Sequence, residues 1–307
     1  MAVPSKLHDL DSSYLENWAS QAILQTAHAK VAQRIPLLAQ SDPGWLAVQI
    51  HVHTGQRYSL GETDRTFPLM SAIKPFLLLY LLEQFGAEKV FEWVGVLPSD
   101  QPFNSLNQLI ADRGHPRNPM INSGAILLSG YLPGKTGTDR CQALCEWLNA
   151  KAGCQLTLDE AMLASVRSAG REPNQSLVRH LSETKHITKP ATVIDAYEQI
   201  CCLSGNVVDL ACLGDLLAYE RSLISLQHRQ AVNALMLTCG LYEASALYAV
   251  KVGLPMKSGI SGALIAIVPR QGTIACYSPA LDSVGNPIAG LAFVETLANA
   301  LQLSSFI

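Results

Sequence analysis

The sequence predicts an α+β protein in which one mainly antiparallel sheet is built from both ends of the chain, flanked by helices, with a helical region inserted between the ends. Strand-like segments occur near the N-terminus and again near the C-terminus, and the segment between them has apolar residues at helical spacing. At 307 residues with 49% apolar content, the chain is also long enough to bury a large core.

The elements follow in order along the chain. We expect an alanine-rich helix over residues 13–38, a strand over 45–52, a turn at Thr54-Gly55 and a second strand over 56–60. From Lys74 to about Leu226 the pattern is helical, with helices expected over residues 76–85, 141–152, 192–202 and 209–219. A helix over 230–239, a buried hairpin of strands over 263–268 and 273–277, and a final helix over 289–301 complete the chain. We assign 1–70 and 230–307 to a sheet portion and 71–229 to a mainly helical portion of one catalytic unit.

Composition excludes several classes of partner. A net charge of −3 provides no basic surface, so neither nucleic acid nor an anionic membrane is an expected partner. The first twenty residues lack a basic start and an apolar stretch, and no apolar run approaches the length of a bilayer, so we expect a cytoplasmic protein. The spacing of the eight cysteines fits buried free thiols better than disulfides or a zinc site. His51 and His53 are expected on an exposed or edge face of a strand, so we predict no metal and no cofactor.

The motif Ser71-Ala72-Ile73-Lys74 precedes an apolar run and predicts a serine nucleophile activated by lysine. A serine hydroxyl needs a base that holds its proton during attack on a carbonyl, and lysine can act so only as the neutral amine. Residues three apart share a face of a helix, so Ser71 in the first turn and Lys74 one turn on are expected to meet. Burial and a second cation, Lys257, both favour the neutral amine of Lys74.

A second motif, Lys257-Ser258-Gly259, stands directly before the expected hairpin and supports this interpretation. Two similar segments act as internal controls. Residues 182–185 (SETK) repeat the first spacing among polar residues, where we expect a solvated loop, and residues 135–137 (KTG) lie in a turn with no apolar strand after it. The surrounding sequence therefore distinguishes the two functional motifs from these two controls, which have similar residues and spacing.

Several longer segments carry a family resemblance: GQRYSLGE at 55–62, SAIKP at 71–75, PRNPMINSGAI at 116–126, CGLYEAS at 239–245 and GLPMKSGISG at 253–262. With these segments the chain, from about residue 30 to about residue 293, resembles the serine-dependent glutaminases, which share the fold of β-lactamases and DD-peptidases. The resemblance implies hydrolysis of the side-chain amide of glutamine through an acyl-enzyme, which releases ammonia and glutamate.

The resemblance also implies roles for individual residues. By position, the catalytic set is Ser71 as nucleophile, Lys74 as its base, Tyr197, Tyr242 and Lys257. The candidate substrate contacts are Asn122, Asn174, Ser258, Arg167 and Ile260, the last of which would form an oxyanion hole through its backbone N–H together with that of Ser71. Whether Lys74 or Tyr197 is the base in each half-reaction stays open. On their own, Tyr197 also fits an apolar core and Asn174 a turn after Pro173. The family commonly forms dimers or tetramers, so a homodimer or homotetramer is expected.

The substrate pocket departs from the family pattern. Glutaminases usually carry Ser-Glu followed seven residues later by asparagine, and the glutamate binds the substrate's ammonium group. Here residues 165–174 read SVRSAGREPN, so Val166 or Arg167 replaces that glutamate, unless Glu172 reaches in from the shifted loop. Met70 and Arg34 replace a usual glutamine and tyrosine of the same pocket. One alternative is therefore an amidohydrolase of the same mechanism with a different amide substrate, one that carries an added anionic group or lacks a free α-ammonium.

Two further alternatives belong to other functional classes. The first is a non-catalytic binding protein on the same fold, against which the retention of Ser71, Lys74, Tyr197 and Lys257 argues. The second is a nucleotide-binding protein, suggested by the segment SGYLPGKT at residues 129–136. A phosphate loop requires glycine at the position of Ser129 and a strand before it, and the sequence indicates neither.

Overall fold

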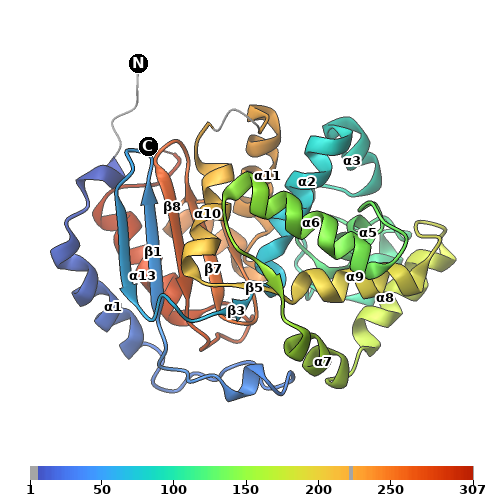
Figure 1. The fold of residues 1–307 in the computed structure, drawn as a ribbon, viewed down its shortest axis with the longest axis horizontal. Coiled ribbons are helices and arrows are strands. Elements are labelled where there is room, and N and C mark those ends of the chain that lie inside the picture. Colours follow the sequence, from blue (N-terminus) through green and yellow to red (C-terminus); the bar gives the residue numbers. More distant parts are fainter. Residues whose placement is uncertain (1–5, 221–223, 307) are drawn as a thin grey trace.

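The main sheet joins the two ends of the chain. The computed structural model describes residues 6–220 and 224–306. Its larger sheet has five strands in the order β2-β1-β8-β7-β6, all antiparallel, and Figure 1 shows it on the left with the helical region on the right. The strands are β1 (Ala47–Val52), β2 (Arg57–Gly61), β6 (Met256–Ser258), β7 (Ala263–Val268) and β8 (Gly272–Tyr277). The predicted α+β class with a sheet from both termini is confirmed.

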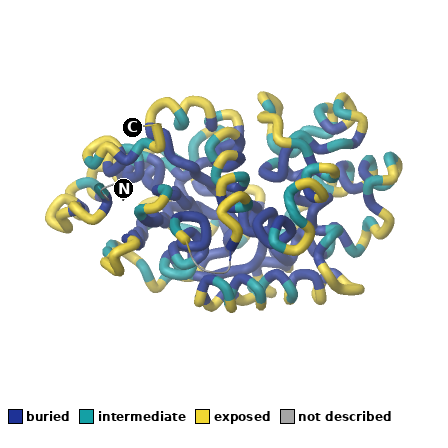
Figure 2. The backbone as a smooth tube through the Cα atoms, turned by 90° about the horizontal axis from the view of Figure 1, so that it is seen from above, coloured by how far each residue is buried: buried dark blue, intermediate teal, exposed yellow. Residues whose placement is uncertain are grey.

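The two faces of this sheet pack against different helices. Helix α10 (Val207–Ala218) covers one face, while α13 (Ile288–Ala300) covers the other and packs in turn against α1 (Leu15–Leu24) (Figure 1). Alternate residues of β7 belong to the two cores, for example Ile265 to one and Leu264 to the other. Because both faces are covered, every residue of the central strands β1, β7 and β8 is buried, and these strands form part of the buried interior in Figure 2.

The helical region is built around α2 (Lys74–Phe85). All side chains from Lys74 to Leu82 are buried, and α2 packs against α5 (Asn122–Ser129), α6 (Gly137–Ala152) and α11 (Leu226–Cys239). A helix that is apolar all round requires such a covering. The remaining α-helices are α3 (Ala87–Trp93), α4 (Leu106–Ala111), α7 (Glu160–Ser168), α8 (Glu172–Glu183), α9 (Pro190–Cys201) and α12 (Ser245–Lys251).

A second, three-stranded sheet was not predicted. It consists of β3 (Phe67–Pro68), β5 (Leu203–Gly205) and β4 (Thr157–Leu158). These strands have only two or three residues, too few for a periodic pattern to appear in the sequence. The backbone N–H of Leu69 continues the pairing by donating to the carbonyl of Leu203 at 2.8 Å. This small sheet therefore fixes the chain directly before the predicted nucleophile.

The expected N-terminal helix over residues 13–38 is wrong in its extent. A 3₁₀ turn at Ser12–Tyr14 leads into α1, which ends at Leu24. The chain after α1 does not continue the helix but pairs with the C-terminal segment. The carbonyl of Lys30 accepts a hydrogen bond from the N–H of Leu281. Tertiary contacts override the helical pattern of 25–38, and residues 32–35 instead line a cavity.

Most other helices begin a few residues before the predicted start. Helix α6 starts at Gly137 because Thr136 and Asp139 form a capping box. Residues 135–136 thus lie in a turn that caps the helix, and residues 130–136 connect α5 to α6, so no strand stands directly before this connection. In residues 182–185, Ser182 and Glu183 end α8, and only the remainder is a turn.

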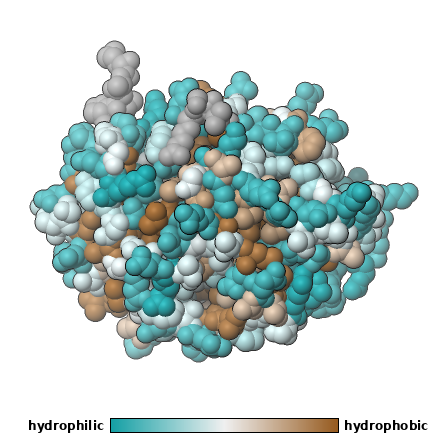
Figure 3. Space-filling model, in the orientation of Figure 1, coloured by the Kyte–Doolittle hydropathy of each residue, from teal (hydrophilic) through white to brown (hydrophobic). Residues whose placement is uncertain are grey.

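Other features of the described residues bear on the excluded classes. All eight cysteines are free, and six of them are buried. His51 is buried, not exposed as expected, because β1 is a central strand and its Nδ1 pairs with Asp215 at 2.9 Å. Over the ranges that the structure describes, no helix has the length and apolar character needed to cross a membrane. Figure 3 shows mostly hydrophilic side chains on the face it presents.

Candidate active site

A cavity of about 350 Å³ lies where α9, the turn before α2, the turn after β6 and residues 32–35 meet. Five of the residues predicted from the sequence line it: Ser71, Asn122, Asn174, Tyr197 and Ile260. They come from segments separated by up to about 190 residues, and the fold brings them to one place. The cavity is therefore the candidate active site.

Ser71 lies in a strained turn directly before α2. The turn is a 3₁₀ helix over Met70–Ile73, so Ser71 is not in the first turn of the α-helix as expected, and Lys74 begins that helix. Met70 has φ of 48°, in the left-handed region, which costs about 1–3 kcal/mol for a non-glycine residue. Met70 is buried and lines the cavity, so the surrounding packing maintains this conformation beside Ser71.

The segment after β6 packs directly on this turn. A Cβ atom added to Gly259 would lie 2.5 Å from the carbonyl oxygen of Leu69 and 3.3 Å from the backbone nitrogen of Ser71. Glycine is required here because only a hydrogen fits between the two backbones. Within the described residues, the N–H groups of Ser71 and Ile260 donate to no protein acceptor. Two free backbone donors thus border the cavity near the serine.

Lys74 is buried one turn after Ser71, with 1% of its surface exposed. Its Nζ donates to the carbonyl of Met120 at 3.1 Å and to Oδ1 of Asn122 at 2.7 Å. Burial lowers the pKa of Lys74 to about 8, because the interior disfavours the charged form. A neutral amine has two N–H bonds and one lone pair, so these two acceptors can satisfy both donors and leave the lone pair available.

Lys257 is completely buried behind Tyr242 and does not line the cavity. Its Nζ lies 4.2 Å from the centre of the Tyr242 ring and donates to the carbonyl of Ser258 at 2.8 Å. Burial, followed by the nearby charge of Lys74, holds the pKa of Lys257 well below its usual range. The charge of Lys74 therefore favours the neutral form of Lys257.

The two predicted tyrosines have different partners. Burial raises the pKa of Tyr242 to about 12, a shift opposed by hydrogen bonds with Ser71 and Ser258. Burial and the neighbouring Cys201 thiol, to which it is hydrogen-bonded, raise the pKa of Tyr197 well above its ordinary value. Both phenols are thus protonated near neutral pH and act as hydrogen-bond donors.

The two predicted asparagines are linked to each other. Asn122 accepts from Lys74 through Oδ1 and donates through Nδ2 to Oδ1 of Asn174 at 3.0 Å. This chain of bonds fixes the orientation of the Asn122 amide and leaves the amide N–H₂ of Asn174 available at the cavity. It also connects α2, α5 and α8 at the site.

Two predicted substrate contacts do not line the cavity. The hydroxyl of Ser258 is fully buried and donates to Oδ1 of Asn286 at 2.6 Å. Arg167 points toward α9, where it pairs with Asp195 and donates from Nε to Glu198 at 3.1 Å. The structure thus brings neither side chain to the cavity.

A model of the Glutaminase family matches residues 29–306. A glutaminase of Synechocystis sp. is 43% identical over 286 residues, which span 92% of this chain and 87% of that protein. The chain belongs to the glutaminase family. A solved structure of YbaS, a probable glutaminase, has a TM-score of 0.89 at 30% identity and covers 97% of this chain and 99% of that one. A structure of the Bacillus subtilis glutaminase YbgJ in covalent complex with 5-oxo-L-norleucine has a TM-score of 0.86 at 26% identity, with 96% and 99% covered.

Glu198 and Cys201 also line this glutaminase's cavity, and sequence reasoning missed both of them. Glu198 is only 3% exposed, and its carboxylate accepts from Nε and Nη2 of Arg171 at 2.6 and 2.8 Å and from Arg167. The signal was present, since Glu198 follows Tyr197 directly and Cys201 lies one helical turn on. A charged residue on an otherwise apolar helix face was the clue.

Of the two residues that could replace the usual family glutamate, Val166 lines the cavity and Arg167 does not. Glu172 is exposed on α8, where it accepts from Ser176 at 2.9 Å. Glu172 therefore does not reach in. Arg34 lines the rim of the cavity, and its Nη1 donates to the carbonyl of Gly170 at 3.3 Å. The carboxylate of this glutaminase's pocket thus comes from α9.

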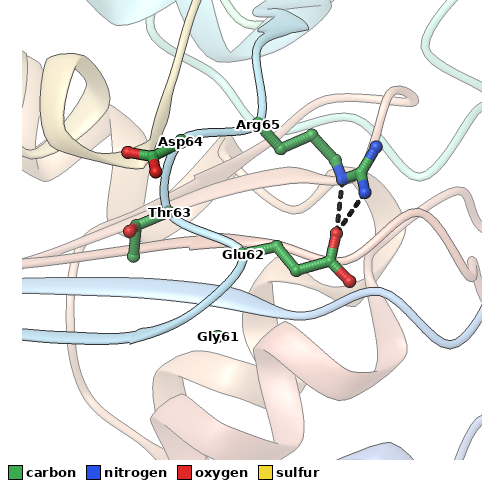
Figure 4. A pocket seen from close by; sticks show the side chains of 5 residues that line it. All are labelled: Gly61, Glu62, Thr63, Asp64 and Arg65. Atoms are coloured by element: carbon green, nitrogen blue, oxygen red, sulfur yellow. Dashed lines mark hydrogen bonds and ion pairs between the residues drawn. The ribbon is translucent and has the colours of Figure 1, made fainter.

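A second hollow on the surface has a different kind of lining. The hollow in Figure 4 is lined by the single segment 61–65, where Glu62 and Arg65 pair with each other and Arg65 stacks on Trp45. Among the described residues, no group of three or more His, Cys, Asp or Glu side chains is placed to hold a metal ion.

Proposed function

We propose that this chain hydrolyses the side-chain amide of L-glutamine to L-glutamate and ammonia through an acyl-enzyme on Ser71. The observation that carries the proposal is the pairing of a cavity-lining serine with a buried lysine one turn later, whose pKa is lowered to about 8. Membership of the glutaminase family supplies the substrate class.

In the acylation step, neutral Lys74 takes the proton of Ser71 while the serine oxygen attacks the amide carbon. The free N–H groups of Ser71 and Ile260 receive the developing oxyanion, where one such donor is worth about 3–4 kcal/mol. The protonated Lys74 then gives its proton to the leaving nitrogen, and ammonia departs. Tyr242, hydrogen-bonded to Ser71, steadies the hydroxyl in the attacking position.

In the deacylation step, Lys74 is neutral again and takes a proton from water as the water attacks the ester. The proton returns to the serine oxygen when glutamate leaves. We assign Lys74 as the base in both steps, because the raised pKa of Tyr197 keeps that phenol protonated. Tyr197 then acts as a hydrogen-bond donor at the cavity, and Lys257 lies buried against the ring of Tyr242.

The alternative of a different amide substrate was suggested by the missing glutamate at position 166 or 167. Glu198 weakens that reason, since it places a carboxylate in the same cavity from another helix. We also propose that the chain acts in the cytoplasm as a homodimer or homotetramer. Free cysteines fit a reducing compartment, and size-exclusion chromatography with light scattering measures the oligomeric state.

The direct test is ammonia release from L-glutamine by the purified protein, with the Ser71→Ala variant beside it. We expect turnover that disappears in the variant. A parallel reaction with 6-diazo-5-oxo-L-norleucine, the compound that forms the covalent YbgJ complex, should label Ser71 as read by mass spectrometry. Labelling without turnover would instead favour a non-catalytic binding protein, and turnover only of other amides would favour the retargeted enzyme.

A further inference from the structure

We propose that Glu198 and Arg34 bind the amino-acid end of the substrate, Glu198 accepting from the α-ammonium group and Arg34 donating to the α-carboxylate. The inference rests on the proposed function, because it assigns the head group of glutamine to two side chains of the same cavity. Neither residue occupies the position where the family pattern places its ammonium-binding glutamate.

The first argument is the charge of the cavity wall. Among the described residues that line the cavity, Glu198 is the one carboxylate and Arg34 is the one cation, since Lys74 and Lys257 lie behind the wall. Free glutamine brings one ammonium and one carboxylate into this space. A buried charge without a partner is strongly disfavoured, so a zwitterion requires one group of each sign.

The second argument is the bonding capacity of Glu198. An ionised carboxylate has about four acceptor sites. Oε2 accepts from both Arg167 and Arg171, whereas Oε1 accepts only from Nε of Arg171. One site on Oε1 therefore stays available for an ammonium N–H. The arginines fix the rotamer of the carboxylate.

The third argument is the charge balance around Glu198. Two arginines beside one carboxylate would repel an ammonium group. However, Arg167 also pairs with Asp195, so two cations and two anions form a group without net charge. The ammonium therefore approaches a carboxylate that is positioned by the arginines without an excess of positive charge.

The fourth argument is that Arg34 and Glu198 lie at the same rim. Arg34 donates to the carbonyl of Gly170, and the next residue, Arg171, holds Glu198. The charge of Arg34 also acts on Tyr197, the neighbour of Glu198 in α9. A guanidinium has five N–H donors, and this bond uses one, which leaves donors for a carboxylate.

The fifth argument is the direction of α9 along the cavity. Glu198 and Cys201 both line it, three residues or about 4.5 Å apart along the helix axis. Cys201 is within electrostatic reach of Lys74, whose charge lowers the pKa of that thiol against the effect of burial. The helix thus runs from the head-group end at Glu198 toward the reacting end at Lys74.

The experiment compares three amides: L-glutamine, 4-carbamoylbutanoate, which lacks the ammonium, and 4-aminobutanamide, which lacks the carboxylate. Glu198→Gln should lower kcat/KM for glutamine about tenfold or more, the scale of a hydrogen bond to a charged group. It should change kcat/KM for 4-carbamoylbutanoate less than about twofold. Arg34→Gln should lower kcat/KM for the two carboxylate-bearing amides and leave that for 4-aminobutanamide unchanged.

Glu172→Gln and Arg179→Gln are matched controls, because this exposed pair lies on α8 and makes the same changes of charge outside the cavity. Both should leave all three values unchanged. An equal loss for all three amides in Glu198→Gln would overturn the proposal and make Glu198 a purely structural partner of the arginines. The wild-type protein gives a second readout that needs no variant to fold: equal kcat/KM for glutamine and 4-carbamoylbutanoate would overturn it as well. Absence of any Ser71-dependent ammonia release would instead reject the proposed function.

Discussion

The two ends of the cavity are built in different ways. The reacting end is built from short segments, since Ser71 and Lys74 are three residues apart. A single glycine, Gly259, allows the segment after β6 to approach the turn that carries Ser71. The head-group end is assembled from α7, α8, α9 and the N-terminal segment through Arg167, Arg171 and their charged partners. A local motif constrains its own geometry. Ion pairs between residues that lie far apart in the sequence constrain less, because another residue of the same pocket can supply the same charge. On our proposal, this difference allows the family chemistry to persist while the ammonium-binding carboxylate comes from another helix.

Removal of the base should have the largest effect on the reacting end. Lys74→Met keeps the apolar stem and removes the amine, so kcat for glutamine should fall about 10²- to 10⁴-fold, the range for loss of a general base. The measurement is ammonia release at saturating glutamine. Lys251→Met, a half-exposed lysine on α12, is the control and should retain full activity. Retention of more than about a tenth of the activity in Lys74→Met would assign the base to another group.

Gly259→Ala should have the next largest effect. The added Cβ lies 2.5 Å from the carbonyl oxygen of Leu69, so the backbone beside Ser71 must shift and separate the two oxyanion donors. Loss of one donor lowers kcat about 10²- to 10³-fold. Gly44→Ala, where a Cβ meets only the Asp42 side chain, is the control. A variant that keeps the wild-type kcat would show that the close approach of these backbones has no catalytic role.

The reacting end could largely be predicted from the sequence, whereas the head-group end could not. The pair at 71–74 and the hairpin near Lys257 follow from spacing and context, whereas the pair of asparagines follows from the family resemblance. The structure places Asn122 against Lys74. Glu198 was not predicted because its role depends on Arg171 and Arg167, about thirty residues away. The 3₁₀ turn at Ser71 and the short second sheet were also missed, since both depend on backbone contacts made by the folded chain.

The pH dependence should report the reacting end alone. Lys74 must be neutral to accept a proton, and its pKa is lowered to about 8 by burial, so activity should rise with pH and level off above about 8. Below this value kcat/KM should fall about tenfold per pH unit. Glu198→Gln should leave the midpoint of the kcat profile unchanged, because the head-group end does not contact Lys74. A shift of more than about one unit in that variant would show that the two ends are coupled.

The smallest expected effect is a partial recovery of activity when a carboxylate is placed on α7 in the absence of the Glu198 carboxylate. Val166 lines the cavity from α7 and is one of the two residues that could replace the family glutamate. Val166→Glu in the Glu198→Gln background should recover about threefold to tenfold of the lost kcat/KM for glutamine, since a bond to a charged group contributes about 1 kcal/mol even in imperfect geometry. It should not raise kcat/KM for 4-carbamoylbutanoate, which has no ammonium group to bind. Ala164→Glu, exposed on the same helix, is the control. Recovery for Val166→Glu and not for Ala164→Glu would establish that the head-group end needs a carboxylate in the cavity and accepts it from either helix, whereas equal gains for both amides would trace the effect to general repacking.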